Sequence, residues 1–283
     1  MGTAALGTAA LGDGLLLLHG AGGRALAWQN QLLAFPRARA EDLPGRAGGA
    51  PTSVDGFLRA LREMLGQGAA LGPGGVRDSG GPRIVAGHSL GGAIALRWAL
   101  VYPEEVRALV LLCTGARLRV APQILEGIRT ADPAAIEQFG AMWLGTNPPP
   151  RLREKSLALL HAAPPAVLAA DLEASDGFDV MAELGHLALP VLVICGAEDR
   201  LTPVKYGRYL HERIAGSELV IIERAGHMVM LEQPAAVNRA MQLFLERLDR
   251  EALGRHAPRR QAPRREAQRR EAPDREVGDA RDG

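Results

Sequence analysis

The chain has 283 residues, of which 47% are hydrophobic, and its 33 basic and 32 acidic residues give a formal net charge of +1. This length allows one large domain or two small ones, and the near-neutral charge favours neither nucleic acid nor any other charged partner. No apolar run is long enough to span a bilayer and no secretory leader pattern is evident, so we expect a cytoplasmic protein without a membrane partner.

The N-terminal part of the chain predicts a strand followed by a helix. Residues 1–14 are small and weakly patterned, and they predict one poor edge strand or no ordered element. The run Leu15–Leu18 predicts a buried strand, which the glycine-rich segment His19–Gly23 follows directly. Helical spacing then extends from Arg24 to Leu33, and we expect Trp28 to pack inward.

The next segment predicts a short strand, an amphipathic helix and a loop. Ala38–Leu43 is long enough for a short strand, and a Pro-Gly pair follows it. The stretch Val54–Leu65 has helical periodicity, with one apolar face made of Phe57, Leu58, Leu61 and Leu65. The stretch Gly66–Pro82 is rich in glycine and predicts a flexible surface loop.

A strand, a sharp turn and a helix are predicted around Ser89. The apolar run Ile84–Ala86 ends at the sequence Gly87-His88-Ser89-Leu90-Gly91-Gly92, and helix-forming residues continue to Leu100. A serine at such a turn is strained and projects its hydroxyl from the sheet edge toward the N-terminus of the helix. Free N–H groups at that terminus favour developing negative charge, so Ser89 is a candidate nucleophile.

A long helical segment separates two groups of strands in the rest of the chain. The stretch Val106–Cys113 predicts an apolar strand, whereas residues 117–185 are helical in character and are interrupted by the proline-rich breaks Asn147–Pro150 and Pro164-Pro165. Strands and helices then alternate again, with strands predicted over 190–196 and 218–222 and helices over 203–214 and 234–248.

Continuous apolar strands separated by helices indicate an α/β fold with a mostly parallel central sheet covered on both faces. We expect residues 1–116 and 186–250 to form this core, and residues 117–185 to form a helical cap inserted between two of its strands. Residues 251–283 consist mainly of Arg, Ala, Pro, Glu and Gln and predict a disordered tail. Its interleaved acids and its lack of aromatic residues favour a solvated tail over a nucleic-acid contact.

Two later loops contain partners for Ser89. A serine hydroxyl needs a base to remove its proton and a third group to orient that base. In a parallel sheet, such groups lie in loops at the carboxyl ends of the strands. The loop after residues 191–195 offers Asp199, with Glu198 as a rival, and the loop after the next strand offers His227. The order Ser, Asp, His is the one that accompanies this strand-turn-helix site.

Together, Gly87–Gly92, Gly196–Asp199 and Gly226-His227 resemble the α/β-hydrolase superfamily, as does the early His19–Gly23. The likeness covers roughly residues 15–116 and 186–248, and the helical insertion lies at the usual cap position of that family. Many relatives carry Leu-Pro-Gly-His-Gly after the early strand, where this chain has Leu43-Pro44-Gly45-Arg46-Ala47. We expect this departure to affect the shape of the pocket more than the mechanism.

The resemblance implies a role for each matching residue. Ser89 would attack the acyl carbon, His227 would take its proton, and Asp199 would hold the imidazole and stabilise its charged form. The backbone N–H groups of Ala21 and Leu90 would bind the oxyanion. We expect Phe139, Met142, Trp143 and Met228 to line the substrate pocket.

The remaining polar residues suggest no second site. We call the loop that follows Leu15–Leu18 and contains Ala21 the oxyanion loop. We expect His19 to lie beneath this loop and His88 to be held in the turn at Ser89, both in structural roles. The two cysteines, Cys113 and Cys195, end apolar runs and are expected to be small buried residues. No spacing of His, Cys and Asp is typical of a metal site, so neither a metal nor another cofactor is expected.

These features predict a serine hydrolase that cleaves a small to medium, largely apolar carboxylic ester, lactone or thioester. A serine at position 89 argues against haloalkane dehalogenation, which needs a carboxylate nucleophile. Carbon–carbon bond hydrolysis and perhydrolysis on the same triad are alternatives. From a different class, a hydrolase-like ligand receptor would retain the triad, and an interaction protein would act through the Arg-rich tail. The physiological substrate and the oligomeric state do not follow from the sequence.

Overall fold

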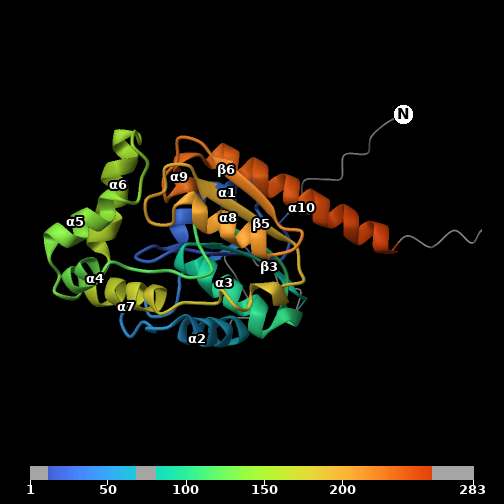
Figure 1. The fold of residues 1–283 in the computed structure, drawn as a ribbon, viewed down its shortest axis with the longest axis horizontal. Coiled ribbons are helices and arrows are strands. Elements are labelled where there is room, and N and C mark those ends of the chain that lie inside the picture. The colour runs from blue at the N-terminus through green and yellow to red at the C-terminus, as the bar shows by residue number, and fades with distance from the viewer. Residues whose placement is uncertain (1–11, 68–80, 257–283) are drawn as a thin grey trace, which may run out of the picture.

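A computed structural model describes residues 12–67 and 81–256 of the chain (Figure 1). The expectations for the N-terminal residues 1–11 and for most of the glycine-rich loop therefore concern residues outside this range, as does the expectation for the tail beyond residue 256.

One sheet of parallel strands forms the centre of the described part of the chain. In spatial order its strands are β2 (Arg39–Glu41), β1 (Leu15–Leu18), β3 (Arg83–His88), β4 (Val106–Leu112), β5 (Val191–Gly196) and β6 (Glu218–Ile222). All five neighbouring pairs run parallel, which confirms the expected α/β class. The carboxyl ends of these strands therefore meet at one edge of the sheet, where the loops that follow β1, β3, β5 and β6 come together.

Helices connect the strands. The α-helices are α1 (Gln29–Ala34), α2 (Val54–Gln67), α3 (Leu90–Val101), α4 (Pro122–Arg129), α5 (Pro133–Ala141), α6 (Pro150–Ala162), α7 (Pro165–Asp176), α8 (Val204–Arg213), α9 (Val229–Glu232) and α10 (Pro234–His256). The described residues also form the short 3-10 helices η2 (Ala25–Trp28), η3 (Pro103–Glu105) and η4 (Leu184–His186). The helix predicted from Arg24 to Leu33 is thus a 3-10 turn followed by the short α1, and Trp28 is buried as expected.

Alternate residues of the strands feed two separate hydrophobic cores, one on each face of the sheet. Leu15 and Leu17 pack on one face with α9 and α10, whereas Leu16 and Leu18 pack on the other with α2, α3 and α8. A strand that is buried on both faces needs a continuous apolar run rather than an alternating one. This requirement explains the sequence Leu-Leu-Leu-Leu in β1.

Helices α4 to α7 all lie between β4 and β5 in the chain and lie together beside the sheet, on the left of Figure 1. Each of them has a proline in its first turn, where the missing N–H costs no hydrogen bond. The proline clusters expected to interrupt this segment are therefore the starts of α6 and α7. Among the described residues no single helix is long and apolar enough to cross a membrane, although α6 and α7 would pass as a pair bent by 98°.

The C-terminal helix α10 is longer than expected. It continues to His256, past the predicted end at residue 248, so the first residues assigned to the tail, 251–256, are helical. Arg247 and Glu251 form an ion pair of 2.8 Å one helical turn apart, and such pairs stabilise a helix that has left the core. The change in composition marks the end of the buried face rather than the end of the helix.

Candidate active site

Ser89 occupies the sharp turn between β3 and α3. Its backbone has φ 53° and ψ −117°, a strained conformation for a residue with a side chain. Its N–H donates to the carbonyl oxygen of Leu112, and its own carbonyl accepts from Thr114 Oγ1, at 3.0 and 2.8 Å. A methyl group at Gly91 would lie 2.3 Å from the carbonyl oxygen of Leu18, so only glycine allows α3 to pass this close to β1.

His227 and Asp199 meet at the same edge of the sheet. The Nδ1 atom of His227 donates to Oδ2 of Asp199 at 2.8 Å, and both side chains are buried. Thr202 completes the surroundings of the carboxylate, because its hydroxyl donates to Oδ2 at 2.7 Å and its backbone N–H donates to Oδ1 at 2.9 Å. This geometry fixes the imidazole tautomer that leaves Nε2 of His227 available as a base.

The pKa of Asp199 reflects two opposing effects. Burial raises it, but the positive charge of a protonated His227 and the hydrogen bonds from His227 and Thr202 lower it more strongly. The net result is a pKa well below the usual range for a carboxyl. Asp199 is therefore ionised near pH 7 and can stabilise a positive charge that forms on the imidazole.

The rival carboxylate, Glu198, faces elsewhere. Its Oε2 atom accepts hydrogen bonds of 2.6 and 2.7 Å from the backbone N–H and the hydroxyl of Thr146, in the segment between α5 and α6. It therefore ties the helical segment to the core, and of the two carboxylates it is Asp199 that bonds the imidazole of His227.

Ser89 and His227 line a common cavity of about 60 Å³, together with His88, Ala21, Leu118, Arg119, Val120, Phe139, Trp143, Leu172, Ser175, Leu201, Thr202, Tyr206 and Met228. Three of the four predicted pocket residues are in this set, and Met142 is not. Phe139 and Trp143 are four residues apart and their rings meet edge to face at 5.8 Å, so they point the same way. Met142 lies between them in sequence and packs against the core instead.

The proposed oxyanion donors lie on either side of Ser89. Leu90 is the first residue of α3, so its backbone N–H has no partner within the helix. Ala21 lines the cavity from the loop after β1. In the described part of the chain, neither N–H donates to another backbone carbonyl in a turn or loop. Both are thus available to a negatively charged oxygen next to Ser89.

His88 and His19 support the loops around the site. The Nε2 atom of His88 donates to the backbone carbonyl of His227 at 2.9 Å, and the two rings lie 4.7 Å apart. The Nδ1 atom of His19 donates to the carbonyl of Gly20 at 2.8 Å, while its Nε2 atom accepts from the N–H of Leu43 at 2.9 Å. Both side chains therefore form hydrogen bonds to backbone groups. They are placed to stabilise the loops rather than to react with the substrate.

Burial lowers the pKa of His19 to about 4 and that of His88 to about 3, so both are neutral in the folded protein near pH 7. The unfolded chain has histidines with a pKa of about 6.5 and binds more protons below that pH. The free energy of unfolding is therefore not reduced by these histidines above pH 6.5. As the pH falls from 6.5 toward 4, each of them lowers the free energy of unfolding by about 1.4 kcal/mol per pH unit.

We therefore expect the free energy of unfolding of His19→Gln to fall less steeply between pH 6.5 and 4.5 than that of the wild type. Urea titrations at several pH values measure both slopes. The exposed His161 offers a matched control, and His161→Gln should keep the wild-type slope. Parallel slopes for His19→Gln and the wild type would contradict the account.

One cluster of potential metal ligands lies at the same place. The donor atoms of Cys113, Asp199 and His227 are all within 4.8 Å of one another. Burial raises the pKa of Cys113, which keeps its sulfur a thiol, while a metal binds the thiolate. The carboxylate and imidazole already bond each other and Thr202. This donor set fits an acid–base pair better than a metal centre.

Sequence reasoning missed Thr202 and most of the cavity wall. Thr202 follows Asp199 by three residues, and at this spacing in a turn both its hydroxyl and its N–H can donate to the Asp199 carboxylate. This spacing is the sequence signal that could have identified Thr202. Leu118, Arg119 and Val120 follow β4, whose carboxyl end is at the same edge of the sheet as the loops that contain Ser89, Asp199 and His227. By contrast, Leu172 and Ser175 come from α7, and no local pattern indicates that this helix reaches the site.

Comparisons with known proteins identify the family of this chain. The model of the alpha/beta hydrolase family matches residues 15–240. A pimeloyl-[acyl-carrier protein] methyl ester esterase of Neisseria meningitidis serogroup B is 30% identical over 251 residues, which cover 81% of this chain and 92% of the relative. A putative carbamate hydrolase of Variovorax paradoxus is 28% identical, with 84% and 93% covered. A solved thermophilic esterase is 36% identical with a TM-score of 0.70, and the match covers 83% of this chain and 90% of that one.

The match to the family model spans β1 to the first part of α10, and so includes the Ser89 turn and the loops that contain Asp199 and His227. The chain belongs to the alpha/beta hydrolase family.

Proposed function

We propose that this ester hydrolase cleaves small to medium, largely apolar carboxylic esters through an acyl-enzyme on Ser89. One observation carries the proposal: the buried hydrogen bond between Asp199 and His227 ends at the same cavity as the strained Ser89 turn. A nucleophile, a base and an orienting carboxylate on one cavity are the parts that acyl transfer requires.

The proposed reaction has two half-steps. His227 Nε2 takes the proton as Ser89 Oγ attacks the ester carbonyl, and the N–H groups of Ala21 and Leu90 stabilise the oxyanion of the tetrahedral intermediate. The imidazolium, held by Asp199, returns the proton to the leaving alkoxide, which departs as the alcohol. Water then attacks the acyl-enzyme with His227 as base, which releases the carboxylic acid and restores Ser89.

The size and lining of the cavity support a small group next to Ser89. Its volume of about 60 Å³ is far below the roughly 300 Å³ of pockets that hold drug-sized ligands. Most of its lining side chains are apolar, among them Leu118, Val120 and Leu172. Either the acyl group or the alcohol group at the reacting end of the substrate is therefore short.

The relatives support ester hydrolysis over the other reactions of such a triad. Relatives at 29% and 30% identity are named as methyl ester esterases, and one solved structure at 36% identity is an esterase. Carbamate hydrolysis is a second candidate because other relatives carry that name and the same groups would act on a carbamate carbonyl. Carbon–carbon bond hydrolysis, perhydrolysis and a receptor role have no comparable support.

A substrate panel tests the proposal. Because the p-nitrophenyl leaving group is itself large, the acyl group of these esters has to be the short one. We therefore expect p-nitrophenyl acetate and butyrate to be hydrolysed with a higher kcat/KM than the decanoate. Methyl esters and an aryl carbamate of matched size extend the comparison. An inactive wild type that still binds small esters would favour a ligand receptor, and a preference for the carbamate would favour the second candidate.

A further inference from the structure

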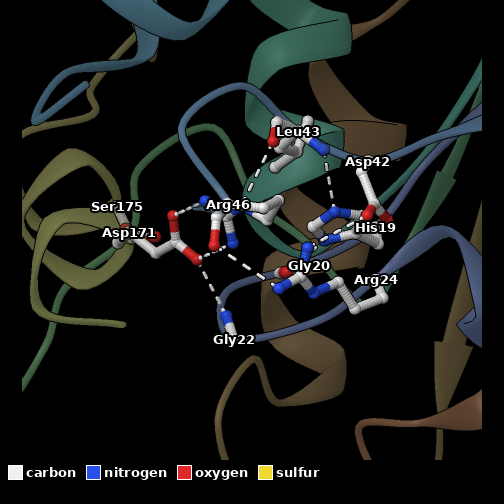
Figure 2. A network of polar contacts seen from close by, with 9 residues as sticks. All are labelled: His19, Gly20, Gly22, Arg24, Asp42, Leu43, Arg46, Asp171 and Ser175. Atoms are coloured by element: carbon white, nitrogen blue, oxygen red, sulfur yellow. Dashed lines mark hydrogen bonds and ion pairs between the residues drawn. The ribbon is translucent and has the colours of Figure 1, made fainter. Parts of the chain in front are cut away.

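A buried ion pair joins the helical segment to the core beneath the oxyanion loop. Arg46 lies in the loop after β2 and Asp171 in α7, and their side chains are only 7% and 0% exposed. The guanidinium meets the carboxylate with two parallel hydrogen bonds, from Nη1 to Oδ2 at 2.7 Å and from Nη2 to Oδ1 (Figure 2). This forked geometry fixes the relative orientation of both groups.

The same carboxylate also holds the oxyanion loop. The backbone N–H of Gly22, the residue after Ala21, donates to Oδ2 of Asp171 at 2.9 Å (Figure 2). Gly22 has φ +67°, and a methyl group there would lie 3.0 Å from Leu168, one turn earlier on α7. Helix α7 thus packs directly on this loop, and its carboxylate binds the peptide next to the proposed donor.

The underside of the loop belongs to the same network. Arg46 Nε donates to the carbonyl of Leu43 at 3.1 Å, and the N–H of Leu43 donates to His19, whose other nitrogen donates to Gly20. Hydrogen bonds therefore hold the residues on both sides of Ala21 in sequence, Gly20 through His19 and Gly22 through Asp171 of α7; Figure 2 shows both contacts. The peptide of Ala21 has little freedom to turn away from Ser89.

Stability is a weak reason to bury these charges. Desolvation of an ion pair offsets most of its attraction, and apolar replacements of both partners are often neutral or stabilising. Catalysis gives a stronger reason, because an oxyanion donor must be held within about 0.5 Å of its productive position. The neighbouring residues Leu172 and Ser175 of the same helix line the cavity, so the contact of Asp171 with the loop aligns both the donor and a wall of the pocket.

We propose that Asp171 and Arg46 are positioning residues, which hold the Ala21 N–H where the oxyanion forms. This inference rests on the proposed esterase function. The donor acts only in the transition state, so its displacement lowers kcat and leaves KM nearly unchanged. Removal of a whole oxyanion donor costs about 10²- to 10³-fold in kcat, and we expect about 10- to 100-fold for a displaced one.

The test replaces the pair by apolar residues of similar size, Arg46→Met together with Asp171→Leu. The double variant should keep a melting temperature close to that of the wild type while its kcat on p-nitrophenyl acetate falls 10- to 100-fold. Its affinity for butylboronic acid, which forms a tetrahedral adduct like the intermediate, should weaken by a similar factor. Arg46→Lys, which keeps the charge, should recover part of kcat and serves as the readout if the double variant does not fold.

A second ion pair on α7 provides the matched control. Glu173 binds Arg129 of α4 at 2.9 Å on the surface, so Arg129→Met with Glu173→Gln should leave kcat unchanged. Wild-type kcat in a folded Arg46→Met/Asp171→Leu variant would overturn the inference, as would wild-type kcat in Arg46→Lys or a loss confined to KM. Failure of the proposed function is distinct, because it would appear as an inactive wild type or as full activity in Ser89→Ala.

Discussion

Ser89→Ala is expected to lower kcat on p-nitrophenyl acetate by about 10⁴- to 10⁶-fold, with KM little changed. The variant loses the atom that forms the acyl-enzyme, and the oxyanion donors alone leave only a small residual rate over water. Steady-state kinetics measure the loss, and circular dichroism checks that the fold is retained. The alanine keeps the strained turn but buries nothing new, so the protein should remain folded.

The control for this variant is a serine away from the cavity. Ser156 is buried in α6, and in the described part of the chain its hydroxyl has no hydrogen-bond partner. Ser156→Ala should therefore hydrolyse the ester at the wild-type rate. Comparable activity in Ser89→Ala and Ser156→Ala would rule out Ser89 as the nucleophile.

Asp199→Asn should have the next largest effect, a loss of about 10⁴-fold in kcat. The amide carries no charge to stabilise the imidazolium, and its NH₂ group, if turned toward Nδ1, favours the tautomer with the proton on Nε2. The base would then be unable to accept the proton of Ser89. Thr202 would lose part of its hydrogen bonding as well, so unfolding by urea is measured beside the kinetics.

Glu198→Gln is the matched control, because it makes the same chemical change one residue away. Glu198 bonds Thr146 and not the imidazole, so we expect kcat within a few-fold of the wild type. A large loss in Glu198→Gln with little loss in Asp199→Asn would reverse the assignment of the two carboxylates.

The strands and the order of the candidate triad could be predicted because both depend on local pattern. The run Leu15–Leu18 is continuously apolar because both faces of β1 are covered, and such a run can be identified without knowledge of its neighbours. Ser89, Asp199 and His227 each follow a strand, and the parallel arrangement then brings them to one edge. For these features, the sequence pattern and the topology both follow from a parallel sheet that is covered on both faces.

The features that escaped prediction depend on contacts between distant segments. Arg46 and Asp171 are 125 residues apart in the sequence. In the sequence alone, each is a charged residue of the kind that usually lies on the surface. The cavity wall includes Leu172 because α7 packs on the oxyanion loop, and the apolar residues of the helical segment give no sign of which ones reach Ser89. At Arg247, an ion pair along α10 extends the helix past the residue where its buried face ends.

The central claim is that Ser89 is the nucleophile, activated by His227 and Asp199. A fluorophosphonate forms a covalent bond to the oxygen of an activated serine with loss of fluoride, so the modified peptide identifies the residue. After labelling and proteolysis, mass spectrometry is expected to find one adduct, on Ser89, with labelling slowed strongly in Asp199→Asn. An adduct on another serine, or no adduct in a wild type that hydrolyses esters, would contradict the account.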